Sequence, residues 1–269
     1  MTATVSRVVV FSDVHLGTKQ CNRDAFSKFV QQLGRDTPDG IVIDGDLVDF
    51  WRRSNAEVLT ENKEVLRDLF GLSCDIAYVV GNHDYAIWDV ADRHSKDVMW
   101  PSTDQELGLE FCRDSRFQCG ENTYYVTHGY DLDVAVTMEY LPLETYEAFA
   151  AAQCRADDTL GSAASLLWDA ITIAGKHIPT ARKVSNGSHE DIEYRDIYDV
   201  ANSGAAHLLL GCHPGDRLIY GHTHYPYITK DGQVANTGSW CTEAGLPVHN
   251  TYVEITENGM TLERFGVPA

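Results

Sequence analysis

Aspartate, asparagine and histidine side chains recur in five short clusters along the chain, and each cluster directly follows an apolar run. In chain order the clusters are Asp13 and His15; Asp44 and Asp46; Asn82, His83 and Asp84; His128; and His222 and His224. Carboxylate, imidazole and amide groups together form a mixed ligand set that suits Mn²⁺, Fe or Zn²⁺. Such a set is larger than one ion needs, so it can serve two divalent ions that share one carboxylate. Paired ions about 3.5–4 Å apart are the standard arrangement for in-line displacement at phosphorus.

The spacing within two clusters indicates that their members share an ion. Asp13 and His15 are two residues apart, as are His222 and His224, and residues two apart in an extended segment point the same way. Formal charges add a second argument. Two divalent ions bring about +4, the carboxylates of Asp13 and Asp46 about −2, and a bridging hydroxide about −1. The remainder is about +1, so the site would attract a phosphate anion although the protein is acidic.

Three apolar runs must position the first clusters. Residues 8–11, 41–43 and 76–80 are apolar and rich in β-branched side chains, as is typical of buried strands. Helix-like patterns at 24–33 and 56–70 separate them, which predicts βαβ units and a largely parallel sheet. Ligands gather at the carboxyl ends of parallel strands, so the clusters are expected to converge.

The later part of the chain predicts a different organisation. Short strands are expected at 123–126, 218–220, 225–229, 233–236, 251–255 and 260–265. Those from residue 218 onwards suggest a second, mostly antiparallel sheet. Residues 137–210 are expected to form a helical insertion, or cap, within one domain spanning 1–269. Inside it, an apolar stripe at 160–174 favours helix packing over an acyl groove, and 180–193 predicts an exposed loop.

The composition excludes several classes of protein. The 269 residues include 40 acidic and 21 basic side chains, a formal charge of −19, so the basic excess of a dedicated nucleic-acid binder is missing. No run of about eighteen apolar residues is present, so any membrane contact is at most peripheral. The N-terminal residues lack the apolar core of a signal peptide, which favours a cytoplasmic location. The seven cysteines form no CxxC pair, which indicates reduced, mostly buried thiols.

The order of the clusters resembles that of a known family. Asp13-x-His15, Gly45-Asp46, Gly81-Asn82-His83-Asp84, His128-Gly129 and Gly221-His222-x-His224 are similar to the motifs of the calcineurin-like metallophosphoesterase superfamily. Each motif alone is short and unspecific, but five in the same order cover most of the chain. The resemblance implies an α/β protein with a four-layer α/β/β/α sandwich.

The resemblance also implies a role for each motif residue. One ion would be held by Asp13, His15, Asp46 and His224, and the other by Asp46, Asn82, His128 and His222. Asp46 would bridge two divalent ions, with Mn²⁺ expected first and Fe, Zn²⁺, Co²⁺ or Ni²⁺ as alternatives. His83 would act as general acid on the leaving oxygen and Asp84 would orient it, while a metal-bridging hydroxide would attack phosphorus.

Within the superfamily, several segments are similar to the UDP-2,3-diacylglucosamine hydrolase group of lipid A synthesis. They are Ser12–Gly17, Gly45–Trp51, Gly221–Pro226 and Asn236–Trp240. That group typically has Arg at the position of His83, and Gly-Asp directly after the metal His, where this chain has Gly129-Tyr130-Asp131. The resemblance therefore implies a related pyrophosphatase or phosphodiesterase acting on a small-molecule or lipid-linked phosphate ester. It does not extend to the lipid A substrate.

Three further residues are candidates for substrate binding. Arg52 and Arg53 follow Asp46 closely and could clamp a phosphate, with solvated surface arginine as the alternative. Asp131 follows His128 and is a third candidate, with solvation of a loop as its alternative.

Some residues and functions remain as alternatives. Asp44 and Asp49 are expected to cap a helix or to support the ligands without binding metal. A DNA exonuclease of the same superfamily is a second function, which the negative charge and only seven lysines disfavour. A non-catalytic scaffold on this fold is a third, which the retention of the whole ligand set disfavours.

Overall fold

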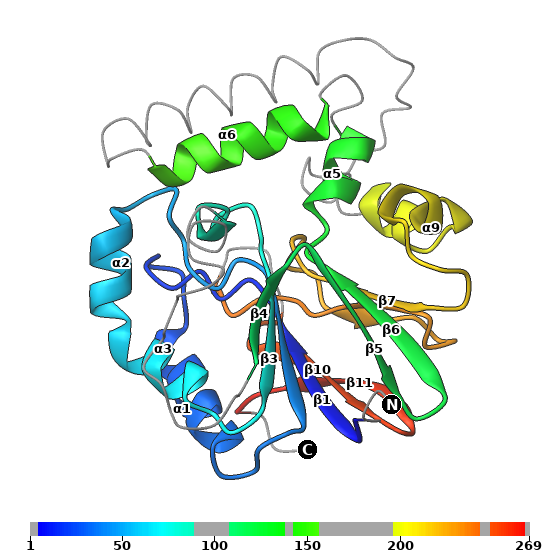
Figure 1. Cartoon of the computed structure of the whole chain (residues 1–269), viewed down its shortest axis with the longest axis horizontal. Helices are drawn as coiled ribbons and strands as arrows, with labels where there is room; N and C mark the ends of the chain where they lie inside the picture. Colours follow the sequence, from blue (N-terminus) through cyan, green and yellow to red (C-terminus); the bar gives the residue numbers. More distant parts are fainter. Residues whose placement is uncertain (1–4, 89–107, 138–141, 156–195, 243–247, 267–269) are drawn as a thin grey trace.

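Two sheets pack face to face at the centre of the molecule, and helices cover their outer faces (Figure 1). The computed structural model describes residues 5–88, 108–137, 142–155, 196–242 and 248–266. The first sheet has the strand order β11-β10-β1-β2-β3-β4 and the second has the order β5-β6-β7-β9-β8. This is the four-layer α/β/β/α sandwich that the sequence predicts.

The first sheet contains the three strands predicted at the start of the chain. β1 (Arg7–Phe11), β2 (Gly40–Asp44), β3 (Asp75–Val79) and β4 (Leu109–Cys112) run parallel, with Val9 opposite Ile41 and Ile43 opposite Tyr78. β10 (Thr251–Thr256) and β11 (Gly259–Arg264) extend this sheet antiparallel on the other side of β1.

The second sheet is mixed, which corrects the prediction of a mostly antiparallel one. Its strands are β5 (Asp114–Cys119), β6 (Asn122–Thr127), β7 (Arg217–Tyr220), β8 (Tyr227–Ile228) and β9 (Val234–Asn236). β6 pairs with β7, and β7 with β9, in parallel, while β5 and β8 add antiparallel edges. The final hairpin, β10–β11, belongs instead to the first sheet, because β10 pairs antiparallel with β1. Short-range patterns could not reveal this long-range pairing.

The strands of the first sheet are buried on both faces, which explains their continuous apolar sequences. On one face, Val9 and Phe11 belong to a hydrophobic core that includes buried side chains of the helices α1 (Arg23–Leu33), α2 (Asn55–Glu61) and α3 (Lys63–Phe70). On the other face, Val8 and Val10 lie against Tyr124, Val126 and Ile219 of the second sheet. Alternate side chains of one strand thus enter two different cores.

The helix predicted at 56–70 is divided into α2 and α3. The break falls at Asn62, whose backbone adopts φ −103° and ψ 8°. The Asn62 side-chain amide donates to the Val58 carbonyl at 2.8 Å, so it competes with the helical hydrogen-bond pattern.

Helices also cover the outer face of the second sheet and the ends of its strands. α5 (Tyr130–Thr137) and α9 (Gly204–Leu210) lie beside it, and α6 (Leu143–Arg155) lies across the carboxyl ends of the strands (Figure 1). α6 and α9 belong to the predicted insertion at 137–210, whereas α5 precedes it and reaches only its first residue. The stripe at 160–174 and the loop at 180–193 lie outside the described residues. Among the described helices, none is long and apolar enough to cross a membrane.

Candidate metal centre and catalytic site

The predicted clusters meet at the carboxyl ends of β1, β2, β3, β6 and β7, but not as extended segments. Six described non-glycine residues have positive φ, and five of them belong to the predicted ligand set. These five are Asp13, His15, Asp46, His222 and His224, with φ between 51° and 63°. The left-handed conformation is uncommon outside glycine and costs about 1–3 kcal/mol per residue, so it persists only where the surroundings impose it. Tight turns, and not extended backbone, therefore direct these side chains to one place.

The Asp13 carboxylate is held by one oxygen and leaves the other without a hydrogen bond. Oδ2 accepts from the backbone N–H of His222 at 2.9 Å and from the hydroxyl of Ser12. Oδ1 is buried and accepts no hydrogen bond, although it lies 3.2 Å from His224 Nε2 and 3.7 Å from His15 Nε2. A buried carboxylate oxygen in this state requires a cation or another donor.

Asp46 follows the same pattern and lies between two groups of ligands. Its Oδ1 accepts from the backbone N–H of His83 at 2.8 Å. Its Oδ2 lies 3.8 Å from His15 Nε2 on one side and 3.3 Å from His128 Nε2 on the other. One carboxylate oxygen therefore faces both halves of the cluster.

The first half of the cluster combines Asp13, His15 and His224. The Nε2 atoms of His15 and His224 face each other at 3.2 Å. Together with Asp13 Oδ1 they form a compact group of two imidazoles and one carboxylate that can hold a metal ion.

The second half combines Asp46, Asn82 and His128. The Nδ1 atom of His128 lies 2.7 Å from the backbone oxygen of Asp44. A carbonyl oxygen can only accept, so Nδ1 donates to it, and Nε2 is the nitrogen available to a metal ion. That Nε2 lies 3.2 Å from Asn82 Oδ1, so both atoms and the Asp46 oxygen converge.

His222 lies beside this second half but turns its ring nitrogen elsewhere. Its ring centre is 5.3 Å from that of His128. Its Nε2 lies 3.1 Å from Asp133 Oδ2. The ligand groups formed by described residues do not include His222. Asp133 is therefore a neighbour of the site. Its i+5 position from His128 offered no motif signal.

The side chains that meet here provide donor atoms that suit divalent metal ions, as expected for metal ligands. A buried carboxylate oxygen of Asp13 without a hydrogen bond, a second carboxylate, three imidazole rings and one amide oxygen converge there. Oxygen and nitrogen ligands with no described thiolate among them suit Mn²⁺, Fe, Co²⁺, Ni²⁺ or Zn²⁺, and they do not select one.

The electrostatics of the cluster favour positive charge. Burial alone would raise the pKa of Asp46, but the attraction of His128 and His83 lowers it. Burial alone would lower the pKa of His128, but Asp46 raises it to about 10. Asp44 differs, because it is fully buried without a hydrogen-bond partner and burial raises its pKa far above the usual range. Asp13 shows the opposite direction, because burial would raise its pKa but the attraction of His224 and His15 lowers it.

Asp49, and not Asp84, holds the imidazole of His83, which corrects the predicted orientation of this residue. The His83 Nδ1 atom lies 3.1 Å from Asp49 Oδ2, and the Asp49 side chain is fully buried. Asp84 instead accepts hydrogen bonds from Leu47 N at 2.9 Å, Tyr78 OH at 2.6 Å and Gly81 N at 2.8 Å. Asp84 therefore fixes the loops after β2 and β3. Burial and the repulsion of Asp46 raise its pKa to about 7.

Trp51 supports His83 from the other side. The two rings stack at 4.1 Å between centroids and 20° between planes. The indole N–H also donates to the backbone oxygen of Asn82 at 2.8 Å, which fixes the ring. From above, α6 contacts this pair. The Sγ atom of Cys154 lies 3.2 Å from the backbone oxygen of His83, and the Phe149 ring packs edge-on against Trp51 with 5.9 Å between ring centroids. Burial lowers the pKa of His83, although Asp49 and Asp46 oppose this effect.

The three predicted substrate residues lie in different settings. Arg52 forms an ion pair with Asp49 at 2.5 Å, and its side chain is 60% exposed. Arg53 is paired with Glu61, 2.6 Å from Oε2. Asp131, at the start of α5, has a pKa raised by burial and accepts a hydrogen bond from Leu132 N at 3.2 Å. Arg52 and His83 thus share the Asp49 carboxylate, while Arg53 pairs with Glu61 at the end of α2.

Three glycines give the carboxylates and imidazoles room to approach. A Cβ on Gly45 would lie 2.5 Å from His128 Cγ, and one on Gly81 would lie 2.6 Å from Asp46 N. A Cβ on Gly221 would lie 2.6 Å from Asp13 Oδ2. Real Cβ atoms essentially never come closer than 3.0 Å to such neighbours, so only glycine fits at each position.

A family model described as calcineurin-like phosphoesterase matches residues 6–226. An uncharacterized metallophosphoesterase of Campylobacter jejuni is 27% identical over 108 residues, which are 38% of this chain and only 27% of that protein.

Similar solved structures include a dimetal phosphatase from Danio rerio (13% identity, TM-score 0.46), which covers 98% of this chain and 100% of that one. They also include a Vps29 single mutant from Entamoeba histolytica (13% identity, TM-score 0.42), which covers 97% and 99%. With the family model matching most of its length, the chain belongs to the calcineurin-like phosphoesterase family.

Proposed function

We propose that this protein is a dinuclear metal-dependent phosphohydrolase that cleaves a phosphodiester or pyrophosphate bond. One observation carries the proposal: Asp46 Oδ2 lies 3.8 Å from His15 Nε2 and 3.3 Å from His128 Nε2, between two groups of ligands. An oxygen in this position can be shared by two ions. When bound, the ions would lower the pKa of water and offset the negative charge that develops on the phosphate.

The chain's own residues divide the remaining tasks. Asp13, His15 and His224 would hold one ion, Asn82 and His128 the other, and Asp46 both. His222 would complete the second set once its ring turns from Asp133. Each carboxylate is already fixed by backbone donors, so little reorganisation would be needed when metal binds.

His83 would donate a proton to the leaving oxygen. Its Nδ1 faces Asp49 and Trp51 covers one ring face, so Nε2 is the nitrogen left for the substrate. Asp49 holds the ring in the tautomer and orientation that this transfer requires. Arg52, paired with Asp49 and largely exposed, could reach a phosphate oxygen beside His83.

The substrate is proposed to be a small or lipid-linked phosphate ester handled in the cytoplasm. Phe149 and Cys154 of α6 lie over His83 and Trp51, so the insertion is well placed to select the group that departs. The pyrophosphatase reading, and the likeness to the UDP-2,3-diacylglucosamine hydrolase group, rest on the motifs alone.

Turnover of bis(p-nitrophenyl) phosphate with Mn²⁺, Co²⁺ or Ni²⁺ tests the proposal. Wild-type protein should release p-nitrophenol, and His83→Ala should lower kcat about 10²–10⁴-fold while binding metal normally. His213→Ala, at an exposed histidine beyond α9, is the matched control and should keep full activity. Equal rates for the wild type and His83→Ala would refute the role of His83. A metal-loaded wild type with no turnover of diesters, monoesters or pyrophosphates would refute the function.

A further inference from the structure

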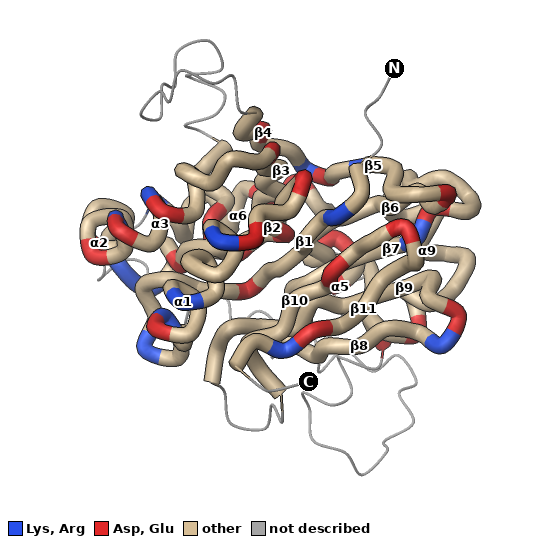
Figure 2. The backbone as a smooth tube through the Cα atoms, turned by 90° about the horizontal axis from the view of Figure 1, so that it is seen from below, with Lys and Arg blue, Asp and Glu red and all other residues tan. Residues whose placement is uncertain are grey.

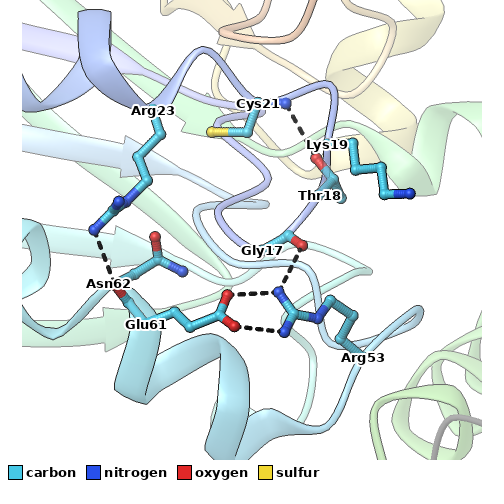
Figure 3. Close-up of a pocket in the computed structure, with 8 residues that line it drawn as sticks. All are labelled: Gly17, Thr18, Lys19, Cys21, Arg23, Arg53, Glu61 and Asn62. Carbon is cyan, nitrogen blue, oxygen red and sulfur yellow. Dashed lines mark hydrogen bonds and ion pairs between the residues drawn. The ribbon is translucent and has the colours of Figure 1, made fainter.

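A cavity of about 250 Å³ opens beside the loop that follows His15. Figure 3 shows it between that loop, the first residue of α1 and the end of α2, with Lys19, Arg23, Arg53 and Glu61 around it. Ligand-binding pockets usually have about 300–1,000 Å³, so this cavity suits one chemical group and not a whole ligand.

The walls of the cavity are tied to the metal-binding loop. The hydroxyl and the backbone N–H of Thr18 both donate to the His15 oxygen, at 3.0 and 3.1 Å. Gly17 has φ +109°, and a Cβ there would lie 2.8 Å from Val58 of α2. The loop is therefore packed tightly against α2, and the cavity has fixed sides.

Positive charge gathers around the cavity although the whole chain carries −19. Arg53 holds the Glu61 carboxylate with two hydrogen bonds of 2.6 and 2.8 Å, and Arg23 donates to the Glu61 backbone oxygen at 2.9 Å. Lys19 has no hydrogen bond or ion pair to the described residues. Three cationic side chains and one carboxylate thus line the cavity, and Glu57 outside it lies 3.7 Å from Arg53. Figure 2 shows that Lys and Arg positions alternate with Asp and Glu positions around α1 and α2.

We propose that this cavity is a subsite for a second phosphate group of the substrate. Arginine forks and a lysine ammonium can engage several oxygens of one phosphate together. Glu61 occupies part of the same cationic surface, so it competes with the incoming anion. Gly17 and Thr18 line the cavity, and Thr18 donates to the His15 oxygen, so the cavity and the proposed metal centre share one loop. The assignment to the substrate rests on the proposed function, whereas phosphate binding itself does not.

Calorimetric titration of the full chain with inorganic phosphate tests the binding. A chelator keeps the metal centre from holding the anion. Lys19→Met and Arg23→Met should each weaken phosphate binding about tenfold, because each removes a charge-assisted contact. Glu61→Gln should strengthen it several-fold by removing the competing charge. Lys28→Met, at an exposed lysine on α1 outside the cavity, should change nothing. No binding by the wild type, or equal binding by all variants, would overturn the subsite.

A matched pair of substrates then identifies the source of the phosphate. The p-nitrophenyl ester of thymidine 5′-phosphate is compared with the same ester bearing a further 3′-phosphate, using metal-loaded enzyme. The wild type should prefer the doubly phosphorylated ester, and Lys19→Met and Arg23→Met should reduce that ratio of kcat/KM about tenfold. An unchanged ratio despite weakened phosphate binding would assign the cavity to free phosphate and overturn the substrate role. If neither ester is cleaved, the proposed function fails while the titration still decides the subsite.

Discussion

Replacing Gly81 by alanine should damage the metal centre more than the fold. The added Cβ would lie 2.6 Å from the Asp46 backbone nitrogen and still closer to Asp46 Oδ1. The backbone of Gly81 does not have positive φ, so alanine can adopt its conformation without strain. The substitution therefore acts through steric contact alone.

The size of the effect follows from these contacts. To restore a 3.0 Å contact, the Asp46 backbone must move by at least about 0.4 Å, and its carboxylate by more. Overpacking of this kind lowers the unfolding free energy by about 1–3 kcal/mol. Displacing groups that orient a metal ligand costs about 10–100-fold in metal affinity. The variant should therefore stay folded, bind Mn²⁺ about 10–100-fold more weakly and lose activity at limiting metal.

Calorimetric titration with Mn²⁺ and urea unfolding measure the two effects separately. Gly204→Ala is the control, because a Cβ there meets nothing within 4 Å at the start of α9. It should bind metal like the wild type and be equally or slightly more stable. Wild-type Mn²⁺ affinity in Gly81→Ala would show that Asp46 does not hold a metal ion in this position, and the bridging role would have to be abandoned.

Three further predictions follow from the same contacts. Asp49→Asn should lower kcat about 10²-fold with metal content retained, whereas Asp84→Asn should mainly lower stability. Steady-state kinetics and metal analysis measure these effects. The reverse result would restore Asp84 as the partner of His83. Removing metal with a chelator should lower the unfolding free energy by about 2.7 kcal/mol for each bound ion, relative to protein at a metal concentration of a hundred times Kd. Calorimetry showing no shift would argue against a resident ion. Arg116 lowers the pKa of Asp216 by hydrogen bonding, so this pair stabilises the fold above the unfolded-state pKa of about 3.9 and ceases to do so as the pH falls through the lower folded-state pKa. The destabilisation caused by Asp216→Asn should therefore shrink as urea unfolding is moved from pH 7 towards pH 3, and a pH-independent difference would contradict this account.

Contacts of α6 with residues before β5 and with α5 hold this helix of the insertion beside the site. Glu147 accepts from Arg113, which precedes β5, and from Tyr130 OH at 3.0 Å. Tyr130 in turn stacks on Tyr146 at 5.7 Å. These contacts hold α6 above His83, so the position of the cover is coupled to the loop after His128.

Local sequence determined which residues could bind metal and which strands would carry them. The β-branched runs at β1, β2 and β3 are buried on both faces, a requirement that can be read directly from continuous apolar sequence. Because parallel strands end at the same edge of a sheet, the convergence of Asp13, Asp46 and Asn82 could also be predicted. Periodicity was less informative at Asn62, where one side-chain hydrogen bond divides a helix.

The tertiary structure decided how those residues are held. Only the folded chain shows that β10 and β11 join the first sheet, since pairing between strands more than two hundred residues apart leaves no local pattern. It also shows that Asp49, not Asp84, supports His83, because the choice depends on how two loops pack and not on adjacency in sequence. The left-handed turns at the ligands have the same origin. Contacts from neighbouring strands impose a backbone conformation that the residues themselves disfavour.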